Sequence, residues 1–365
     1  LDADDLWQPT FLESIFKLIQ SFPEARIFGT NYEEVWESVI KKPHNGSEIL
    51  PINFLGYLNF FKINVKQGIY NHGSVCFHKE VFEKSAQTAN ALINEGISKG
   101  DKVAICMQNN PEFIFAYLGI VGIGAVCVPL NSWWVPSEVI YGLEHSDAKL
   151  LFADQKRMQG LECLKDVKKI ITTYTPDPLF KSFSDFINEQ SISFPEIEIG
   201  RNDPATIYYT SGSTGKPKGV LSSQKAVIAT LFSWACFSSI MKEVDNQKNP
   251  NTPPLLDEAS AILLCVPLFH VTGSHAGMFM SILVGRKIVM MKKWDAGIAL
   301  KLIEQEKISD ITGVPTQTWE LLNHPDRLNY DLSSLKTLGA GGAPRPAEHV
   351  KQLDSEFEAR PGIGY

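Results

Sequence analysis

The sequence predicts an α/β fold in which two parallel-rich βαβ subdomains pack together with a smaller β element. From about residue 79 onward, short continuous apolar runs alternate with segments whose apolar residues recur at helical spacing. Such runs are typical of strands buried on both faces, as in parallel sheets covered by helices. The length of 365 residues exceeds that of most single cores, so more than one subdomain is expected.

The expected strands are short, buried and separated by helices or loops. They cover residues 102–107, 124–130, 148–154, 168–174, 205–210, 261–268, 286–291, 308–314 and 335–340. Helices are expected at residues 82–93, 137–145, 222–235, 297–306 and 346–357. The polar stretch 242–257 contains three prolines and is expected to be an exposed loop.

The run from residue 113 to 130 carries no charge and is long enough to be tested as a membrane span. It contains three glycines and a proline, and the preceding "NNPE" places Pro111 at the first position of a helix. We therefore expect a buried helix of about three turns and then a short strand, without an integral membrane span.

Composition and charge narrow the class of protein. Hydrophobic residues make up 44% and charged residues 21%, as in globular proteins. The net charge of -7 offers no basic surface for nucleic acid, so an anionic ligand has to be held by local groups. Cys106, Cys127 and Cys265 lie in apolar runs, which is typical of core thiols in a reducing compartment. The N-terminus lacks the pattern of a signal peptide, and the expected location is cytoplasmic.

The chain is expected to divide at about residue 70. Residues 1–70 predict peripheral helices and a connecting segment without a role in chemistry. Residues 71–365 are expected to form the main domain, with a first α/β portion at about 71–200 and a second at 201–365. The second portion contains the glycine-rich stretch that carries the functional argument.

That stretch is "YYTSGSTGKPKGV", residues 208–220, directly behind an expected strand. Ligands of α/β sheets collect where strands end, and the stretch is expected to join its strand to a helix starting at residue 222. Its glycines let the backbone approach phosphate oxygens, and its hydroxyls and lysines offer donors and positive charge. The spacing is not that of a Walker loop. A linker has no reason to follow a buried strand, so the stretch predicts a phosphate-binding loop.

The same stretch resembles the phosphate-binding signature of the adenylate-forming (AMP-binding) superfamily, and most of all that of the acyl-CoA synthetases. Three further segments are similar to family segments and occur in the same order: residues 124–154, "VPLFHVTG" at 266–273 and "LGAGGAP" at 338–344. The resemblance covers roughly residues 75–365. It implies the large N-terminal domain of such an enzyme.

The resemblance implies a two-step reaction. A carboxylate attacks the α-phosphorus of ATP and gives an acyl-adenylate and pyrophosphate, and a thiol, usually that of coenzyme A, then takes the acyl group. Because one anion attacks another, positioning and charge neutralisation by the loop and by Mg²⁺ would supply most of the catalysis. The implied cofactors are ATP, Mg²⁺ and coenzyme A.

The resemblance also implies site residues, carried over position by position. The nucleotide-binding residues would be Thr210, Ser211, Gly212, Ser213, Thr214, Gly215, Lys218, Gly341, Gly342, Ala343, Gly364 and Tyr365, the last stacking on adenine. The acid pocket would be formed by Phe269, His270, Gly273 and Ala340. No metal-binding residue is assigned, because His270 and His275 do not have the spacing of a metal pair on a helix.

His270 is the expected catalytic residue, in contact with the carboxylate or gating the second half-reaction. A general base is not required, since a carboxylate has no proton to lose at neutral pH. Amino-acid-activating relatives carry an aspartate in this segment to pair with the substrate's ammonium, whereas this sequence offers His270, Val271 and Thr272. An unpaired buried ammonium is costly, so a plain acid, fatty or aromatic, is expected.

The chain ends at "GIGY", where the family motif continues into a magnesium-binding glutamate and then into a mobile C-terminal lid domain with the catalytic lysine. We therefore expect the lid domain to be absent and this chain alone to adenylate very poorly. Two other functions stay open from the sequence: an enzyme that loads a carrier-protein thiol, and a non-catalytic module that binds an acyl or nucleotide ligand. The particular acid and the oligomeric state are not predicted.

Overall fold

The computed structural model of the chain describes residues 79–164, 169–172, 180–210, 215–248, 260–284, 286–341, 346–356 and 360–363. All of them lie in one compact unit of the chain. The expected peripheral helices of residues 1–70 lie outside these ranges, so that expectation stays a prediction.

The first sheet has seven strands among the described residues, in the order β5-β4-β3-β1-β2-β6-β7. All neighbours run parallel except β6 and β7, which pair antiparallel at one edge. The strands are β1 Lys102–Cys106, β2 Val126–Pro129, β3 Ala148–Ala153, β4 Lys169–Thr172, β5 Lys181–Ser182, β6 Pro204–Thr210 and β7 Lys218–Ser223.

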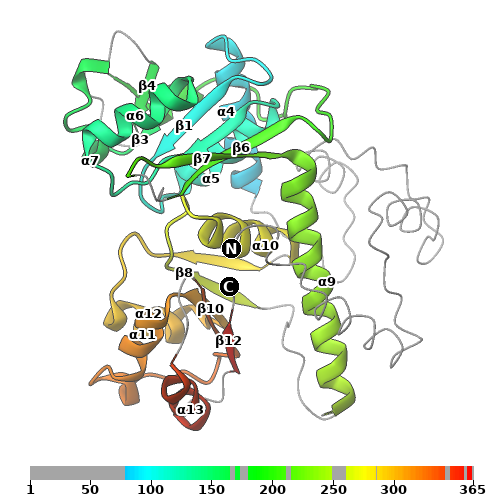
Figure 1. Cartoon of the computed structure of the whole chain (residues 1–365), viewed down its shortest axis with the longest axis vertical. Coiled ribbons are helices and arrows are strands. Elements are labelled where there is room, and N and C mark those ends of the chain that lie inside the picture. Colours follow the sequence, from blue (N-terminus) through cyan, green and yellow to red (C-terminus); the bar gives the residue numbers. More distant parts are fainter. Residues whose placement is uncertain are drawn as a thin grey trace, which may run out of the picture. The chain divides into compact units, whose positions relative to one another are not determined.

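Helices bury both faces of the first sheet (Figure 1). Along β1, Val103 and Ile105 belong to the core that contains α4 and α5, whereas Ala104 and Cys106 belong to the core under α6 and α7. This alternation explains why the strand reads as a continuous apolar run. The helices around this sheet are α4 Lys79–Asn94, α5 Pro111–Gly122, α6 Pro136–Ser146, α7 Gln155–Met158, η2 Glu162–Leu164 and α8 Phe183–Ile187.

The second sheet has five described strands, all parallel, in the order β12-β11-β10-β8-β9. Its strands are β8 Ala261–Leu264, β9 Lys287–Met290, β10 Asp310–Gly313, β11 Thr337–Ala340 and β12 Arg360–Ile363. Its helices are η3 Thr272–Phe279, α10 Met280–Val284, α11 Ala296–Glu306, α12 Pro315–Leu322, η4 Arg327–Asn329 and α13 Ala347–Glu356. Together the two parallel-rich sheets confirm the predicted α/β class. The separate smaller β element does not occur among the described residues.

The uncharged run 113–130 forms the buried helix and strand that were expected. Every residue of α5 from Phe113 to Gly122 is buried, and β2 follows it. A helix that is apolar on all sides is buried in the core of a large domain, which is where α5 lies. Within the described ranges, no helix has the length and hydrophobicity that crossing a bilayer would require. The thiols of Cys106, Cys127 and Cys265 are also buried, as expected for core residues.

The residues that follow the glycine-rich stretch differ in secondary structure from the prediction. The expected helix at residue 222 begins only at Gln224, because Lys218–Ser223 forms β7 and pairs with β6. Helix α9, Gln224–Lys248, is then longer than expected (Figure 1). It includes residues 242–248 of the predicted loop, since no proline interrupts it before Pro250. In the chain, the glycine-rich stretch therefore connects two antiparallel strands and is not followed directly by a helix.

The expected boundary between the two α/β portions, near residue 200, also does not match the boundary between the two sheets. β6 pairs with β2 and β7 pairs with β6, so residues 204–210 and 218–223 belong to the first sheet. The β6–β7 hairpin thus lies at an edge of the first sheet, whereas the expected division placed it in the second portion. The second sheet begins with β8, after α9.

The side chain of Asn109 joins the two sheets. Asn109 follows β1 and is buried, and its Nδ2 donates to the carbonyls of Val266 at 2.9 Å and Met291 at 3.2 Å. Its Oδ1 accepts the N–H of Leu268 at 2.9 Å. These partners follow β8 and β9, so one amide holds the carboxyl ends of three strands together.

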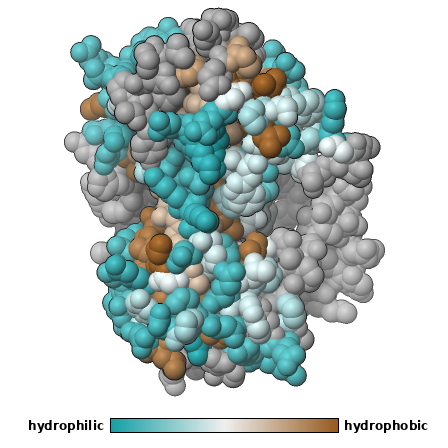
Figure 2. Space-filling model, turned by 90° about the vertical axis from the view of Figure 1, so that its left-hand side faces the viewer, coloured by the Kyte–Doolittle hydropathy of each residue, from teal (hydrophilic) through white to brown (hydrophobic). Residues whose placement is uncertain are grey.

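The face of the molecule in Figure 2 is mostly hydrophilic, and its hydrophobic side chains form small separate groups. Single exposed hydrophobic residues are normal, whereas a gathering of them marks a binding surface. The exposed large residues include Trp133, 68% exposed, which lies beside the candidate site described below.

We predict that Asn109→Ala lowers the free energy of unfolding by about 3 kcal/mol, because it leaves buried backbone groups without partners. Urea unfolding measures the change. Asn323→Ala is the matched control, since Asn323 makes one exposed hydrogen bond to the carbonyl of Trp319, and we expect it to cost about 0.5 kcal/mol or less. Equal losses in both variants would contradict the role of Asn109.

Candidate functional site

A cavity of about 460 Å³ lies where β2, β6 and β8 end. Because parallel strands present their carboxyl ends at one edge of a sheet, the loops that follow them meet there. The cavity is lined by Pro129, Asn131, Trp134, Glu138, Tyr209, Thr210, Gly215, Pro217, Phe269 and His270. It brings together four residues predicted from the sequence: Thr210, Gly215, Phe269 and His270.

The β6–β7 hairpin, which contains the predicted phosphate loop and is called the phosphate-loop hairpin below, contributes Tyr209, Thr210, Gly215 and Pro217 to the cavity lining. Thr210 ends β6 and pairs with Lys218, the first residue of β7, whose side chain is exposed. Gly215 has a φ of +89°, and nothing lies within 4 Å of the position that a Cβ would occupy. A glycine is required there by its backbone conformation, and it leaves open space beside the chain. Ser211, Gly212, Ser213 and Thr214 lie outside the described residues.

Helix α6 supports the base of the hairpin. The hydroxyl of Tyr141 donates to the carbonyl of Pro217 at 3.1 Å, and the hydroxyl of Tyr209 donates to the carbonyl of Gly142 at 3.1 Å. Lys216 Nζ lies 5.4 Å from the centre of the Tyr141 ring, within range of a cation–π contact. The hairpin is thus fixed at both strand ends by one helix.

Phe269 and His270 form another part of the cavity wall, in the loop between β8 and η3. Phe269 is buried, and its ring centre lies 4.5 Å from that of His270. Trp133 meets Phe269 edge-on, with ring centres 5.4 Å apart and an interplanar angle of 85°. His270 is exposed, but its neighbours exclude water from part of the imidazole and lower its pKa. His270 is therefore a neutral side chain at neutral pH, able to donate or accept a hydrogen bond.

Gly273 and Ser274 lie in the first turn of the π-helical segment η3, directly behind His270. π-Helical turns are rare and occur frequently at functional sites. Ser274 Oγ donates to the carbonyl of His270 at 3.0 Å and accepts the hydroxyl of Tyr208 at 2.6 Å. His275 Nδ1 lies 3.1 Å from the same oxygen. This buried network ties the start of η3, and with it His270, to strand β6.

The predicted adenine loop is described in part. Ala340 ends β11 and pairs with Gly313 at the end of β10, and the N–H of Gly341 donates to the Gly313 carbonyl at 2.9 Å. Gly342, Ala343, Gly364 and Tyr365 lie outside the described residues. Lys218, Gly273, Ala340 and Gly341 are not among the residues that line the cavity.

Sequence reasoning missed six residues of the lining, and two segments of the chain carried a signal for four of them. Tyr209 and Pro217 stand inside the quoted glycine-rich stretch. Pro129 and Asn131 lie at the end of β2, where the strand-end rule applies as it did for the loop. Trp134 and Glu138 lie beyond that end, and Glu138 accepts the N–H of Val135 at 3.0 Å at the start of α6. Both lie within residues 124–154, the segment similar to a family segment, but nothing in that segment singled out these two.

Metal ligands do not gather in the described part of the chain. There, no group of three or more His, Cys, Asp or Glu side chains is arranged to hold a metal ion.

The chain matches the AMP-binding enzyme family over residues 70–365 and therefore belongs to that family. Among curated relatives, 4-coumarate–CoA ligase 3 of Arabidopsis thaliana is 32% identical over 284 residues, 76% of this chain and 48% of the relative. 4-Coumarate–CoA ligase 2 of Nicotiana tabacum is 28% identical over 323 residues, 87% of this chain and 57% of the relative. The chain thus spans about half the length of these relatives.

Solved structures agree on the fold. An anthranilate CoA ligase, AuaEII, solved with anthranoyl-AMP, superimposes with a TM-score of 0.69 at 24% identity, over 78% of this chain and 54% of that one. The N-terminal domain of FACL13 from Mycobacterium tuberculosis gives a TM-score of 0.65 at 24% identity, over 78% and 67%. The described part of the chain therefore has the fold of an adenylate-forming N-terminal domain.

We predict that Gly273→Ala destabilises the protein more than Gly277→Ala does. A Cβ at 273 would lie 2.2 Å from the backbone oxygen of Pro267, which cannot move independently, whereas one at 277 would lie 2.4 Å from the rotatable Cδ1 of Leu264. Overpacking of this kind costs about 1–3 kcal/mol, and we expect about 3 for Gly273→Ala and about 1 for Gly277→Ala. Thermal and urea unfolding of both variants measure the two losses of stability. A larger loss in Gly277→Ala than in Gly273→Ala would refute the prediction.

Buried His275 predicts a loss of stability in acid. Burial lowers the pKa of His275 to about 4, from 6.5 in the unfolded chain. Below pH 6.5 the unfolded state binds a proton that the folded state does not, so stability falls by about 1.4 kcal/mol per pH unit until about pH 4. Unfolding free energies measured from pH 7 to pH 4 should show this extra slope in the wild type and lack it in His275→Gln. If the unfolding free energies of the wild type and of His275→Gln change with pH in the same way, the His275 imidazole does not titrate as predicted.

Proposed function

We propose that this protein activates a plain carboxylic acid with ATP and transfers the acyl group to coenzyme A. The observation that carries the proposal is the cavity in which Thr210, Gly215 and Pro217 of the phosphate-loop hairpin lie beside Phe269 and His270. An anion-binding loop and an apolar wall with a neutral hydrogen-bonding group are the two elements needed to bring a phosphate and a carboxylate together. The names of the curated relatives, which are CoA ligases, support the same reaction.

In the proposed first step, a carboxylate oxygen forms a bond to the α-phosphorus of ATP, and the bond from that phosphorus to pyrophosphate breaks. In the second step, the thiol sulfur of coenzyme A bonds to the acyl carbon, AMP leaves, and the thiol proton passes to solvent or to a base. Neither step changes an oxidation state. His270, neutral at the working pH, is proposed to donate an N–H to the carboxylate or to its acyl product rather than to remove a proton.

The described residues fit the phosphates of ATP. Gly215 leaves open space beside the chain, Thr210 lines the cavity, and Lys218 stands across the strand pair from Thr210. We propose that Lys218 and the loop hydroxyls hold the β- and γ-phosphates and that Mg²⁺ arrives with the nucleotide. The bound ion would neutralise charge on the phosphates as pyrophosphate departs. Gly341 and the segment after β11 are proposed to line the adenine.

An aromatic acid is the proposed substrate class. Trp134, Tyr209, Phe269 and His270 supply aromatic rings to the lining, and rings favour edge-on or offset contacts with another flat ring. 4-Coumarate and anthranilate, named with relatives of this chain, are acids of that class. Glu138 is the carboxylate among the lining residues, and one of its oxygens already accepts a backbone N–H. An amino acid is therefore the competing substrate class and belongs in the test.

The test is acid-dependent exchange of pyrophosphate into ATP by the full-length natural protein, with the 365-residue chain assayed in parallel. The panel contains 4-coumarate, anthranilate, octanoate, palmitate and phenylalanine. We expect exchange with the aromatic acids, and we expect the 365-residue chain to be the slower of the two. Lys218→Ala should lower the exchange rate by about a hundredfold, as loss of a charge-stabilising donor does elsewhere. Lys301→Ala, an exposed lysine on α11, is the matched control and should leave it unchanged.

The remaining outcomes separate the alternatives. Exchange with octanoate or palmitate alone would replace the aromatic class by a fatty one, and exchange with phenylalanine would favour the amino-acid class. Acyl transfer to a carrier-protein thiol but not to coenzyme A would identify the carrier-loading reaction. A folded full-length protein that gives no exchange with any acid would refute the proposed activity and favour a binding module.

A further inference from the structure

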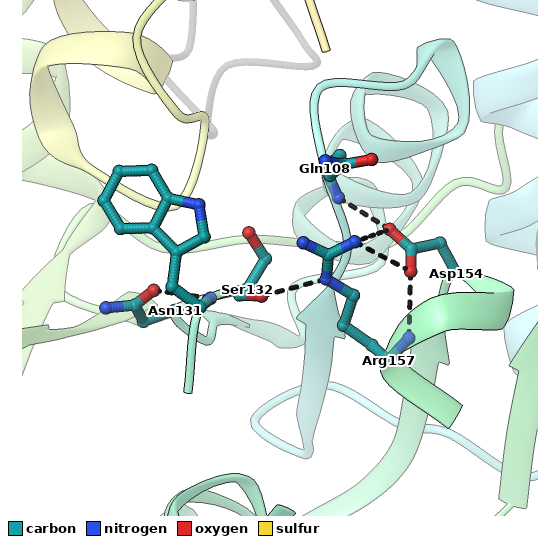
Figure 3. Close-up of polar contacts among 6 residues, drawn as sticks. Gln108, Asn131, Ser132, Asp154 and Arg157 are labelled. Atoms are coloured by element: carbon teal, nitrogen blue, oxygen red, sulfur yellow. Dashed lines mark hydrogen bonds and ion pairs between the residues drawn. The ribbon is translucent and has the colours of Figure 1, made fainter. Parts of the chain in front are cut away.

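A buried ion pair lies behind the cavity wall, at the carboxyl edge of the first sheet. Asp154 directly follows β3, and its side chain and that of Arg157 are 6% and 8% exposed. Arg157 Nη1 lies 3.3 and 3.2 Å from the two carboxylate oxygens of Asp154. The carboxylate also accepts the N–H of Gln108 at 2.9 Å and that of Arg157 at 3.1 Å (Figure 3). The pair therefore joins the ends of β1 and β3.

The same guanidinium reaches the end of β2. Arg157 Nε donates to the carbonyl of Ser132 at 2.9 Å, and Ser132 is itself buried (Figure 3). Within that segment, Asn131 Oδ1 accepts the N–H of Trp133 at 2.8 Å. Residues 131–135, which connect β2 to α6, are thus held by a local turn and by Arg157 from behind.

Residues 131–135 contribute two tryptophan rings at the cavity wall, Trp134 in the lining and Trp133 against Phe269. Trp133 lies edge-on to Phe269, and Trp134 lies edge-on to Tyr209, each with ring centres 5.4 Å apart. Asn131 and Trp134 line the cavity directly. A shift of this segment would therefore move both rings relative to Tyr209 in β6 and to Phe269 after β8.

The fixed directions of its hydrogen bonds explain this ion pair better than a contribution to the free energy of folding does. Removing two charges from water is costly, so a buried ion pair is weak as a source of stability. A guanidinium, however, presents several donors in a rigid plane. Nη1 can hold the carboxylate while Nε holds the Ser132 carbonyl, which a lysine ammonium cannot do with the same fixed directions.

We propose that Arg157 is a positioning residue, which fixes residues 131–135 so that Trp133 and Trp134 hold the shape of the cavity wall. Asp154 holds Arg157 in place. The effect of Arg157 on the acid rests on the proposed function, whereas its effect on the segment does not. Arg157 is not proposed to touch the substrate.

The test compares Arg157→Lys with Arg286→Lys. Lysine at 157 keeps a positive charge beside Asp154 but loses the bond to Ser132. Arg286 pairs with Asp310 in a similarly buried setting in the second sheet, with side chains 11% and 7% exposed, and serves as the matched control. Hydrogen–deuterium exchange of the full-length protein is measured for peptides covering residues 130–135 and 267–272, after urea unfolding has shown that each variant is folded. A double variant, Arg157→Met with Asp154→Asn, replaces Arg157→Lys if the latter folds poorly.

We expect the 130–135 amides to exchange about tenfold faster in Arg157→Lys, through local opening, and to be unchanged in Arg286→Lys. If amide exchange at 130–135 is unchanged in a folded Arg157 variant, the proposal is overturned. This measurement does not depend on enzymatic activity. With 4-coumarate as the first probe, the KM for the acid should rise about five- to tenfold, with kcat and the KM for ATP changing less than about twofold. If the amides exchange faster but the KM for the acid is unaltered, the proposed effect of residues 131–135 on the cavity is overturned. Absence of activity in the wild type would count against the proposed function alone.

Discussion

The hydrogen bonds of Asn109 are the contact on which the candidate site depends. The site is built from loops of two different sheets, so its geometry is set by how the ends of β1, β8 and β9 are held together. Asn109 uses both N–H donor directions and its oxygen in this task, and no side-chain amide group remains to be satisfied by water. A buried polar side chain that is fully paired fixes a single arrangement, because every alternative leaves a group unpaired. Phe269 and His270 follow Leu268 directly and take their positions from this contact.

A second set of contacts holds the His270 backbone and the β6–β7 hairpin. The Tyr208 hydroxyl links β6 to Ser274, and Ser274 holds the carbonyl of His270. Tyr141 and Tyr209 dock the hairpin on α6. Each part of the lining is therefore supported by a polar contact one layer behind it, and the apolar cores of the two sheets supply the remaining packing.

Much of the fold could be predicted from the sequence because parallel strands buried on both faces read as unbroken apolar runs. β1, β3 and β8 were expected for that reason and are present. β7 was not expected, since "KGVLSS" is a half-polar edge strand and its antiparallel partner cannot be read from local pattern. The same limit applies to the contacts that shape the site. Asn109 meets Val266 and Met291 across separations of 157 and 182 residues, and Arg157 meets Ser132 across 25. Periodicity carries no information about such pairs.

The hairpin changes the physical account of anion binding at this site. A loop that runs into a helix would gain from the partial positive charge at the helix N-terminus, but here β7 separates the loop from α9. The protein as a whole carries a net charge of -7, which repels a nucleotide at long range. Under the proposed function, attraction must therefore come from short-range groups such as the Thr210 hydroxyl and the two lysines of the hairpin. Lys216 lies near the Tyr141 ring, while Lys218 is exposed at the start of β7. Lys218 is therefore the lysine proposed to contact a phosphate, and the hydrogen bonds of Tyr141 and Tyr209, rather than a helix dipole, are proposed to position the hairpin for it.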